Sequence, residues 1–427
     1  MTGAAKLKIL VVSNLYPPFQ IGGYEIGCRN VVTGLRERGH AVTVLTAAPP
    51  FDAGPEEDDI RRNLDLCEFT FDPTPPIEIA RFLNIRSRVS NWHNTQALVG
   101  HLTELRPDLV YFFNIWGIGG LALLDAARSL GYPVAIHLMD SIPCILAENV
   151  PADVLALFDA HDGALYQDSR VLAMSRSLVD EIESRCGFQL SAETELVPGW
   201  ADTEPNLFER EYAKDGRIRF VAAGTISEEK GVRLIIEAVA RLKAEGYDGF
   251  DVRIFGPGDV GVYIDLCKRL SVSDIVSFPG RRTQTELREI YETADAFLFP
   301  TWEREPFGFA PVEAAAVGCV PIITDNAGVA ERLVDNVHCL KIRRTSDALK
   351  TRLREVLDDP SILRTIGTCA QVITRHDLSF AQCLDRIERI LGQTAATGRR
   401  RPRNHPGQVG LFYLKHNLTY RLMNYGR

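Results

Sequence analysis

Short apolar runs alternate with amphipathic stretches along most of this chain, and the alternation predicts its secondary structure. In the first half, the apolar runs predict strands at residues 8–13, 41–45, 108–113, 133–138 and 170–174. Helical spacing predicts helices at about 25–38 and at 121–130. A strand, a helix and a second strand within the first 45 residues are typical of a βαβ unit.

The second half repeats this alternation after the stretch 198–205, which has the composition of an interdomain linker. Its apolar runs predict strands at residues 218–223, 251–255, 275–278, 295–299 and 320–324. Helices are predicted at residues 231–245, 260–270, 284–293 and 311–317. Strands that alternate with helices indicate an α/β fold with parallel sheets covered on both faces.

Length and composition fit a globular protein of two domains. A chain of 427 residues is too long for one hydrophobic core and predicts two domains of near-equal size. We place them at residues 1–200 and 201–377, followed by a helix within 378–397 and a tail at 398–427. The tail carries seven basic residues and no acid, so the rest of the chain is more acidic than the net charge of −8. An acidic body argues against nucleic acid as a partner.

The cysteines and the apolar stretches bear on localisation. Nine cysteines without any Cys-x-x-Cys pair indicate neither a disulfide framework nor a zinc site, so we expect reduced thiols in a cytoplasmic protein. The apolar run at 9–12 is too short for a signal peptide and fits a strand. No apolar stretch is long enough to cross a bilayer.

Two carboxylates flank the predicted start of the helix at 311–317. Glu305 lies in the loop before this helix, and Glu313 is predicted to lie in its first turn. The backbone N–H groups of Phe307, Gly308 and Phe309 lie near the helix start, where they are free to bind hydroxyls or an anion. The spacing alone also fits an ordinary capped helix with surface acids. Together with its surroundings, it favours a site for a polyhydroxylated ligand.

Two further loops combine glycine with a following helix. Gly22 and Gly23 let the backbone approach an anion closely, although glycine pairs are also common in simple turns. Lys230 lies at the predicted start of a helix, after Gly224 and Thr225, where it could neutralise a diphosphate or remain a solvated surface lysine. No Walker motif, no Asp-x-Asp and no His/Cys cluster is present, so we expect neither ATPase chemistry nor a metal.

In this order, these motifs resemble the family 4 retaining glycosyltransferases of the GT-B fold. The resemblance covers about residues 8–393. Its motifs are Tyr16-Pro-Pro with Gly22-Gly23-Tyr-Glu25, Gly39-His40-Ala-Val-Thr-Val, Arg106-Pro-Asp-Leu-Val-Tyr111 with Asn114-Ile-Trp-Gly117, Gly224 to Gly231, Phe278-Pro-Gly280, and Glu305-Pro-Phe-Gly308 with Glu313-Ala-Ala-Ala-Val-Gly318. It implies two Rossmann-like domains facing across a cleft, the first binding the acceptor and the second the nucleotide-sugar donor. The helix within 378–397 would return to the first domain.

The resemblance also implies roles for single residues. Glu313 would bind the ribose hydroxyls of the donor, and Glu305 with the amides after it would hold the sugar. Lys230 and the loop of Gly22 and Gly23 would bind the diphosphate. Gly280 and Arg281 would face the nucleobase. The family needs no cofactor, and retention is commonly assigned to attack from the front face without a side-chain nucleophile.

The chain departs from the family at two positions. Thr225 stands where the family usually has arginine, so one cation on the diphosphate is absent, and Arg233 or Arg304 would have to compensate. Met139 stands where the family often has histidine, just before Asp140. His137 lies two residues earlier, on the same strand face as Met139 and displaced by roughly 7 Å. Either His137 serves catalysis from that shifted position or it is a structural histidine and the role is missing.

The acceptor region and the tail leave alternatives open. Residues 52–96, with the acidic run Glu56 to Asp59, would shape the acceptor or form a solvated excursion. The tail places Leu411, Leu414, Leu418 and Leu422 at helical spacing beside basic residues. Such a segment either packs on the protein itself or docks on anionic lipid at the inner membrane face.

The leading prediction is a metal-independent retaining glycosyltransferase that moves a sugar from a nucleotide-diphosphate sugar to a hydroxyl. The acceptor would belong to polysaccharide, glycolipid or glycoside biosynthesis. A nucleotide-sugar-binding protein without turnover is the alternative that Thr225 and Met139 support. A sugar-nucleotide epimerase or a phosphorylase of the same fold is disfavoured by the pair Glu305 and Glu313.

Overall fold

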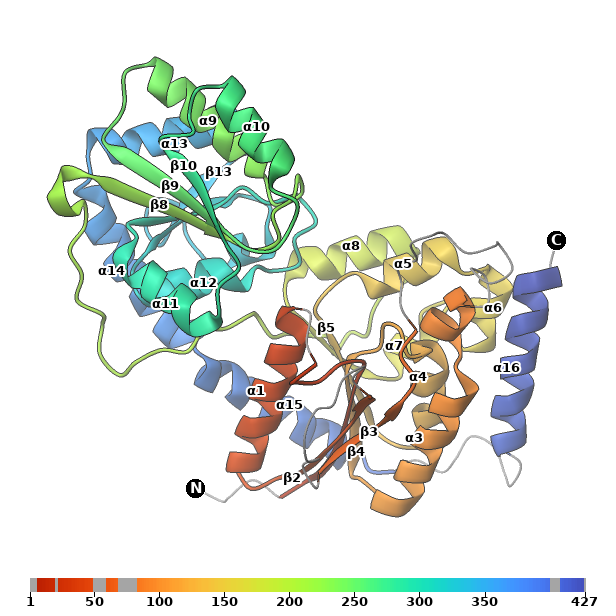
Figure 1. The fold of residues 1–427 in the computed structure, drawn as a ribbon. Helices are drawn as coiled ribbons and strands as arrows, with labels where there is room; N and C mark the ends of the chain where they lie inside the picture. Colours follow the sequence, from red (N-terminus) through yellow and green to blue (C-terminus); the bar gives the residue numbers. More distant parts are fainter. Residues whose placement is uncertain (1–5, 20–21, 49–58, 68–82, 400–407, 426–427) are drawn as a thin grey trace. The chain divides into compact units, whose positions relative to one another are not determined.

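The chain folds into two compact α/β units (Figure 1). The structure is a computed structural model that describes residues 6–19, 22–48, 59–67, 83–399 and 408–425. The N-terminal unit comprises Met1–Ala173, Val179–Val197 and Leu384–Arg427, and the C-terminal unit comprises Met174–Leu178 and Pro198–Cys383. The predicted acidic run at 56–58 and the basic residues at 400–403 and 427 lie outside the described residues.

The N-terminal unit is built on a parallel sheet of seven strands in the order β3-β2-β1-β4-β5-β6-β7. The strands are β1 (Lys8–Ser13), β2 (Ala41–Ala47), β3 (Ile60–Leu64), β4 (Leu109–Asn114), β5 (Val134–Leu138), β6 (Arg170–Ala173) and β7 (Glu195–Leu196). All five predicted strands of this half are confirmed, whereas β3 and β7 were not predicted. Every residue of β4 and β5 is buried, as expected of central strands with helices on both faces.

Helices connect these strands. They are α1 (Gly23–Glu37), the π-helix η1 (Ile85–Val89), α3 (Trp92–Leu105), α4 (Gly120–Ser129), α5 (Ile142–Asn149), α6 (Ala152–Leu157), α7 (Ala164–Gln167) and α8 (Arg176–Cys186). The predicted helices at 25–38 and 121–130 correspond to α1 and α4.

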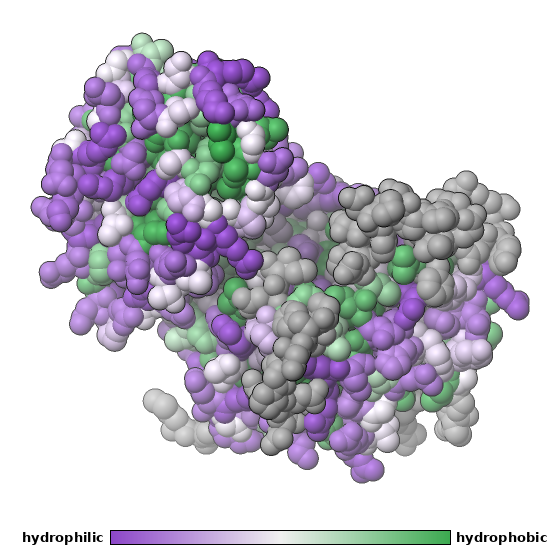
Figure 2. Space-filling view, viewed as in Figure 1, coloured by the Kyte–Doolittle hydropathy of each residue, from purple (hydrophilic) through white to green (hydrophobic). Residues whose placement is uncertain are grey.

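The C-terminal unit has a parallel sheet of six strands in the order β10-β9-β8-β11-β12-β13. The strands are β8 (Ile218–Ala223), β9 (Phe250–Phe255), β10 (Val276–Gly280), β11 (Ala296–Phe299), β12 (Val320–Thr324) and β13 (Leu340–Ile342). The helical elements are η2 (Lys214–Gly216), α9 (Val232–Ala244), α10 (Gly261–Arg269), α11 (Gln284–Thr293), α12 (Phe309–Ala316), η3 (Gly328–Glu331), α13 (Ser346–Asp358) and α14 (Ile362–Asp377). Hydrophilic side chains cover most of the visible surface of this unit (Figure 2).

One predicted position within these elements is wrong. Glu313 was expected in the first turn of its helix, but α12 begins at Phe309, two residues earlier than predicted, and this places Glu313 in the second turn. Gly308, with a φ of +101°, forms the N-cap, so Pro311 is the third residue of the helix and not the first.

In both sheets, the strand order changes direction at one point. In the C-terminal unit, β8, β9 and β10 add strands toward one edge, and β11 then pairs with the other side of β8. In the N-terminal unit, β4 pairs with β1 on the side opposite β2. Ligands of open α/β sheets bind beyond the carboxyl ends of the strands at such a switch point. The loops after β8 and β11, and after β1 and β4, are therefore the expected binding loops.

The end of the chain belongs structurally to the N-terminal unit. The helix α15 (Phe380–Ala396) has its larger part there, and α16 (Gln408–Tyr425) packs against α6, η1, α3 and α4 (Figure 1). Lys415 Nζ donates to Asp125 Oδ2 at 2.7 Å, and Ser90 Oγ and His416 Nδ1 are 2.9 Å apart. The tail therefore packs on the protein, one of the two predicted alternatives. Among the described residues, none of the helices has the length and apolar character required to cross a membrane.

Candidate functional site

The switch point of the C-terminal unit brings together two of the predicted site residues. Lys230, in the loop after β8, forms an ion pair through Nζ with Glu305 Oε2, in the loop after β11. Thr301 Oγ1 donates to the same carboxylate oxygen at 2.8 Å. Lys230 Nζ also lies 5.6 Å from the centre of the Phe299 ring. Side-chain exposure is 32% for Lys230 and 11% for Glu305, so this charged pair is partly withdrawn from water.

A glycine fixes the position of the lysine. Gly231 has a φ of +73°, and a Cβ atom there would lie 2.2 Å from the carbonyl oxygen of Pro300. The turn that carries Lys230 therefore packs directly on the end of β11, and only glycine permits this contact. The backbone N–H of Gly231 closes the turn by donating to Glu228 O at 3.0 Å.

The loop that carries Glu305 is held by a neighbouring turn. Gly328 N donates to Glu305 O at 3.1 Å, and Val329 N donates to Phe307 O at 3.0 Å. Gly328 packs so tightly that a Cβ atom would lie 2.0 Å from Pro306 O. The turn at residues 325–328 therefore supports the loop that carries Glu305.

Backbone donors are available at the start of α12. Across the described part of the chain, no acceptor takes the N–H groups of Phe307, Gly308 or Phe309. The Phe307 side chain is buried, and the Phe309 ring packs edge-on against Trp200 at 5.4 Å. These residues therefore contribute backbone dipoles to the site, and their side chains anchor the loop.

Glu313 lies on the same helix and, among the described residues, forms no hydrogen bond or ion pair with Lys230 or Glu305. Gln284 Nε2 donates to its Oε1 at 3.4 Å, a long hydrogen bond. Burial raises the pKa of the Glu313 carboxyl to about 7, and the charge of Asp202 adds to the increase. The carboxyl is therefore close to half protonated at neutral pH.

The other predicted loops of this unit are bound to one another. Gly256 N donates to Gly280 O at 3.2 Å, and a Cβ atom on Gly256 would lie 1.7 Å from Gly224 O. The loops after β8, β9 and β10 thus stack at one edge of the sheet. Thr225 and Arg281 in these loops are exposed, and Gly280 has open space at its Cβ position.

The two arginines considered as substitutes for the missing cation differ. Arg233 Nε lies 3.1 Å from Glu228 Oε1, so its charge is already paired. Arg304 lies next to Glu305 in the chain, with its guanidinium 4.7 Å from the centre of the Trp302 ring. Within the described residues, Arg304 has no ion-pair partner, so it is the better candidate of the two.

In the N-terminal unit, a tyrosine connects the glycine loop to the loop after β5. Gly22 N donates to Glu25 Oε2 at 2.7 Å, so Glu25 caps the start of α1. The next residues are exposed Gly23 and then Tyr24, whose hydroxyl accepts from Met139 N at 3.1 Å and is hydrogen-bonded to Asp140. Tyr24 and Glu25 were quoted in the motif but were not predicted as site residues. Their position directly after the glycine pair was the available signal.

Asp140 and His137 lie in different environments, the first in the loop after β5 and the second within β5. Burial raises the pKa of Asp140 to about 6, against the hydrogen bonds from Ile142 N, at 3.0 Å, and from Tyr24. His137 is 2% exposed, with Nδ1 2.7 Å from the Tyr111 hydroxyl and its ring 4.8 Å from that of Phe113. Burial lowers the pKa of His137 to about 3, so the ring is neutral in the strand core. This environment fits a structural histidine, and a catalytic role for His137 stays a prediction.

Two Rossmann-like units, each built on a parallel sheet that is covered by helices, are the architecture of the GT-B fold. The family comparisons agree. Residues 21–205 match the model of Glycosyltransferase Family 4, and residues 204–372 match that of Glycosyl transferases group 1. The chain belongs to this family of glycosyltransferases and is a transferase enzyme.

Similar proteins include several named glycosyltransferases. Glycogen synthase of Mycobacterium tuberculosis is 25% identical over 404 residues, which cover 88% of this chain and 92% of that protein. D-inositol 3-phosphate glycosyltransferase of Streptomyces bingchenggensis is 26% identical over 65% of each chain. Among solved structures, sucrose-phosphate synthase from Thermosynechococcus elongatus aligns with a TM-score of 0.72 at 15% identity, over 92% of this chain and all of that one. Anabaena HepE, solved with UDP and glucose, aligns with a TM-score of 0.64 at 18% identity, over 91% of this chain and all of HepE. These structural likenesses concern the fold.

Proposed function

We propose that this enzyme transfers a sugar from a nucleotide-diphosphate sugar to a hydroxyl acceptor, with retention of configuration and without a metal or other cofactor. The observation that carries the proposal is the convergence of Lys230, Glu305 and the N–H groups before α12 at the switch point of the C-terminal unit. A cation and aligned N–H dipoles suit a diphosphate, and a carboxylate suits sugar hydroxyls.

The ion pair between Lys230 and Glu305 describes the site in the absence of donor. Without donor, Lys230 and Glu305 neutralise each other. A diphosphate would draw the lysine toward itself because it offers more charge and more acceptor oxygens than one carboxylate. Glu305 would then accept hydrogen bonds from the sugar, while Thr301 keeps its oxygen oriented. The same lysine and the dipoles of residues 307–309 would stabilise the charge that develops on the leaving nucleoside diphosphate.

Glu313 would bind the ribose. An ionised carboxylate accepts hydrogen bonds from both hydroxyls of a diol, whereas a protonated carboxyl has lost part of this capacity. With a pKa of about 7 in the empty protein, Glu313 would bind donor better as the pH rises through neutrality. Donor binding would therefore release a proton. Gly280 and Arg281 would face the base, and Gly22 and Gly23 would lie toward the diphosphate.

Asp140 is the proposed acidic group on the acceptor side. Its carboxyl, with a pKa of about 6, is mostly ionised at pH 7 and held by Tyr24 and by Ile142 N. An ionised carboxylate there would orient the acceptor hydroxyl by accepting its proton in a hydrogen bond. Proton removal itself would fall to a donor phosphate oxygen, as the family resemblance implies.

The ligands of two similar solved structures indicate which donor nucleotides to test first. HepE was solved with UDP-glucose, and Starch Synthase IV from Arabidopsis thaliana was solved with ADP and acarbose. We therefore propose a nucleotide-sugar donor with uracil or adenine as the first bases to test, and an acceptor from polysaccharide, glycolipid or glycoside biosynthesis. We also propose a cytoplasmic location, because the cysteine pattern of the sequence indicates no disulfide framework. Peripheral contact of the tail with the inner membrane face stays a proposal without structural support.

A second candidate function is nucleotide-sugar binding without turnover. Exposed Thr225 in place of the family's arginine and the neutral, buried His137 favour it. Donor binding without sugar transfer or donor hydrolysis would distinguish this function from catalysis.

A calorimetric panel tests the proposal. Each of four nucleotides (UDP, ADP, GDP and TDP) is titrated into the wild-type protein and into Glu313→Ala. Each titration is done once in the presence of EDTA and once in the presence of magnesium. We expect one nucleotide to bind selectively without magnesium and to lose at least tenfold in affinity in the variant. Equal binding by both proteins would remove Glu313 from the site, and binding only with magnesium would remove metal independence.

A further inference from the structure

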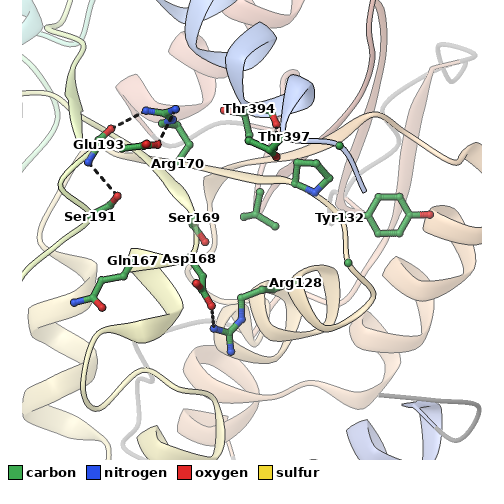
Figure 3. A pocket seen from close by; sticks show the side chains of 14 residues that line it. Arg128, Tyr132, Gln167, Asp168, Ser169, Arg170, Ser191, Glu193, Thr394 and Thr397 are labelled. Atoms are coloured by element: carbon green, nitrogen blue, oxygen red, sulfur yellow. Dashed lines mark hydrogen bonds and ion pairs between the residues drawn. The ribbon is translucent and has the colours of Figure 1, made fainter. Parts of the chain in front are cut away.

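A polar cavity lies in the N-terminal unit, away from the predicted site. It has a volume of about 370 Å³ and lies at the amino ends of β5 and β6, which begin at Val134 and Arg170 (Figure 3). Asp140 follows the opposite, carboxyl end of β5. At about 30 Å³ per water, the cavity holds roughly 12 non-hydrogen atoms of a polar ligand. Cavities of this size fall within the usual range for small-molecule sites.

The charges on its wall are compensated. Arg170 Nη2 lies 2.8 Å from Glu193 Oε2, and Arg128 Nη1 lies 3.1 Å from Asp168 Oδ2. Figure 3 shows these two pairs on different sides of the cavity. No cation on the wall is left to attract a phosphate or carboxylate, so a neutral ligand is favoured over an anion.

Three hydroxyl groups on the wall already donate their hydrogen atoms within the protein. The hydroxyls of Ser169, Thr394 and Thr397 donate to the carbonyl oxygens of Leu165, Ile390 and Thr394, at 2.9, 2.8 and 2.8 Å. Their oxygens keep lone pairs, as does the carboxylate of Glu193. Gln167 Nε2 is also used, by Gln189 O at 3.0 Å. The wall therefore suits a ligand with many O–H or N–H donors.

The same pairing argues against an amine. Because Asp168 and Glu193 are each paired with an arginine, the two ion pairs leave no net negative charge to attract a cation. A neutral, hydroxyl-rich ligand therefore fits this wall better than a charged one. We propose that the cavity is a second carbohydrate-binding site, which takes one neutral monosaccharide unit and is separate from the transfer site.

Ligand-observed NMR with competing probes tests this site. D-glucose, D-galactose and D-mannose are compared with glucose 6-phosphate and glucosamine, at saturating nucleoside diphosphate so that the donor site is filled. We expect millimolar binding of at least one neutral sugar and at least tenfold weaker binding of the phosphate and the amine. Preference for either charged probe, or no sugar binding at all, would overturn the proposal.

A matched pair of variants localises the binding. Thr397→Trp fills the cavity, whereas Ala396→Trp adds the same bulk at an exposed neighbour that does not line it. We expect a loss of sugar affinity of at least tenfold for the first and less than twofold for the second. Both variants should bind nucleoside diphosphate like wild type, so failure here is distinguishable from failure of the proposed function. Equal sugar binding by the two variants would refute the assignment.

A pair of thiols in the same unit carries a second, independent inference. Cys144, in the first turn of α5, and Cys186, at the end of α8, have Sγ atoms 3.8 Å apart. Cys144 is fully buried and its Sγ also lies 3.9 Å from Glu181 O, whereas Cys186 is half-exposed. The hydrogen bond between the two thiols and the charge of Arg185 lower the pKa of the Cys186 thiol. Cys186 is thus the accessible and more nucleophilic partner.

We infer that this dithiol is a reversible modification site closed by peroxides. The Cys186 thiolate attacks the peroxide, an S–O bond forms, the O–O bond breaks, and hydroxide leaves. The Cys144 thiol then displaces water from the sulfenic acid and forms the disulfide. Two molecules of an external thiol reduce this disulfide back to the dithiol. Asp140 Oδ1 accepts from Ile142 N at the start of α5, so the disulfide would restrain the helix that follows Asp140.

Peptide mapping after hydrogen peroxide treatment tests this pair. We expect a single cross-linked peptide that contains Cys144 and Cys186, reversal by dithiothreitol, and no cross-link in Cys186→Ser. Cys369→Ser, at another half-exposed cysteine, is the control and should cross-link like wild type. Nucleoside diphosphate affinity should change less than twofold on oxidation. Over-oxidation of Cys186 without a cross-link, or faster oxidation of Cys369, would overturn the inference.

Discussion

Replacing Lys230 by methionine removes the cation at the switch point while keeping most of the apolar stem. In the proposed site, the hydrogen bond from this lysine to a diphosphate would be charge-assisted and worth about 1.5–3 kcal/mol, or roughly 10- to 140-fold in affinity. The substitution also leaves Glu305, whose side chain is 11% exposed, without its partner. Repulsion between that carboxylate and the nearest phosphate charge adds about 1 kcal/mol, or roughly fivefold.

We therefore expect Lys230→Met to weaken nucleoside diphosphate binding by about 50- to 700-fold in isothermal titration calorimetry. The double variant Lys230→Met/Glu305→Gln should recover about fivefold, because the repulsive charge is gone. Lys243→Met is the matched control, since Lys243 lies on the surface of the same unit, where its Nζ is 2.7 Å from Asp274 Oδ1. Affinity within twofold of wild type for Lys230→Met, or a double variant weaker than the single one, would refute the reasoning.

Three further predictions follow from the same geometry. Donor affinity should rise between about pH 6 and 8, because ionisation of Glu313 with its pKa near 7 improves ribose binding, and Glu313→Gln should flatten this profile; an unchanged slope would contradict it. Gly231→Ala should lower the melting temperature and abolish donor binding, because its Cβ atom would lie 2.2 Å from Pro300 O. Gly246→Ala, with a similar φ but open space around the new Cβ atom, should lower the free energy of unfolding by only about 1 kcal/mol in a denaturant titration. Asp140→Asn should reduce kcat at least tenfold with donor affinity unchanged. Tyr24→Phe should move the acidic limb of the pH–rate profile to higher pH, because the hydrogen bond from Tyr24 lowers the pKa of Asp140. Kinetics like wild type in both variants would remove this loop from catalysis.

The fold was largely predictable because buried parallel strands are continuous apolar runs. The strands from β8 to β12 appear in the sequence within one or two residues of their structural limits. Two of the missed strands, β7 and β13, are two and three residues long, too short for any periodicity. The missed helix α13 did have a signal, since Thr345 caps it and Leu349, Leu353 and Val356 form its buried face.

The site was predictable in its residues but not in its contacts. Glu305 and Lys230 were chosen from local motifs, but their ion pair depends on β11 pairing with β8 across the switch point, which no spacing in the chain encodes. For the same reason, the bond between Tyr24 and Asp140 was not foreseen, because it joins loops after different strands. Burial decided the state of His137, and burial of a strand residue is set by neighbours such as Tyr111 that lie far away in the sequence.

The central claim is metal-independent, retaining sugar transfer at this site. The most direct test is a proton NMR time course of the anomeric signal, with the selected α-linked nucleotide sugar, a hydroxyl acceptor and excess EDTA. The account predicts release of the nucleoside diphosphate together with a product whose first-formed anomeric signal is α. A β product, or turnover that appears only when magnesium is restored, would contradict it.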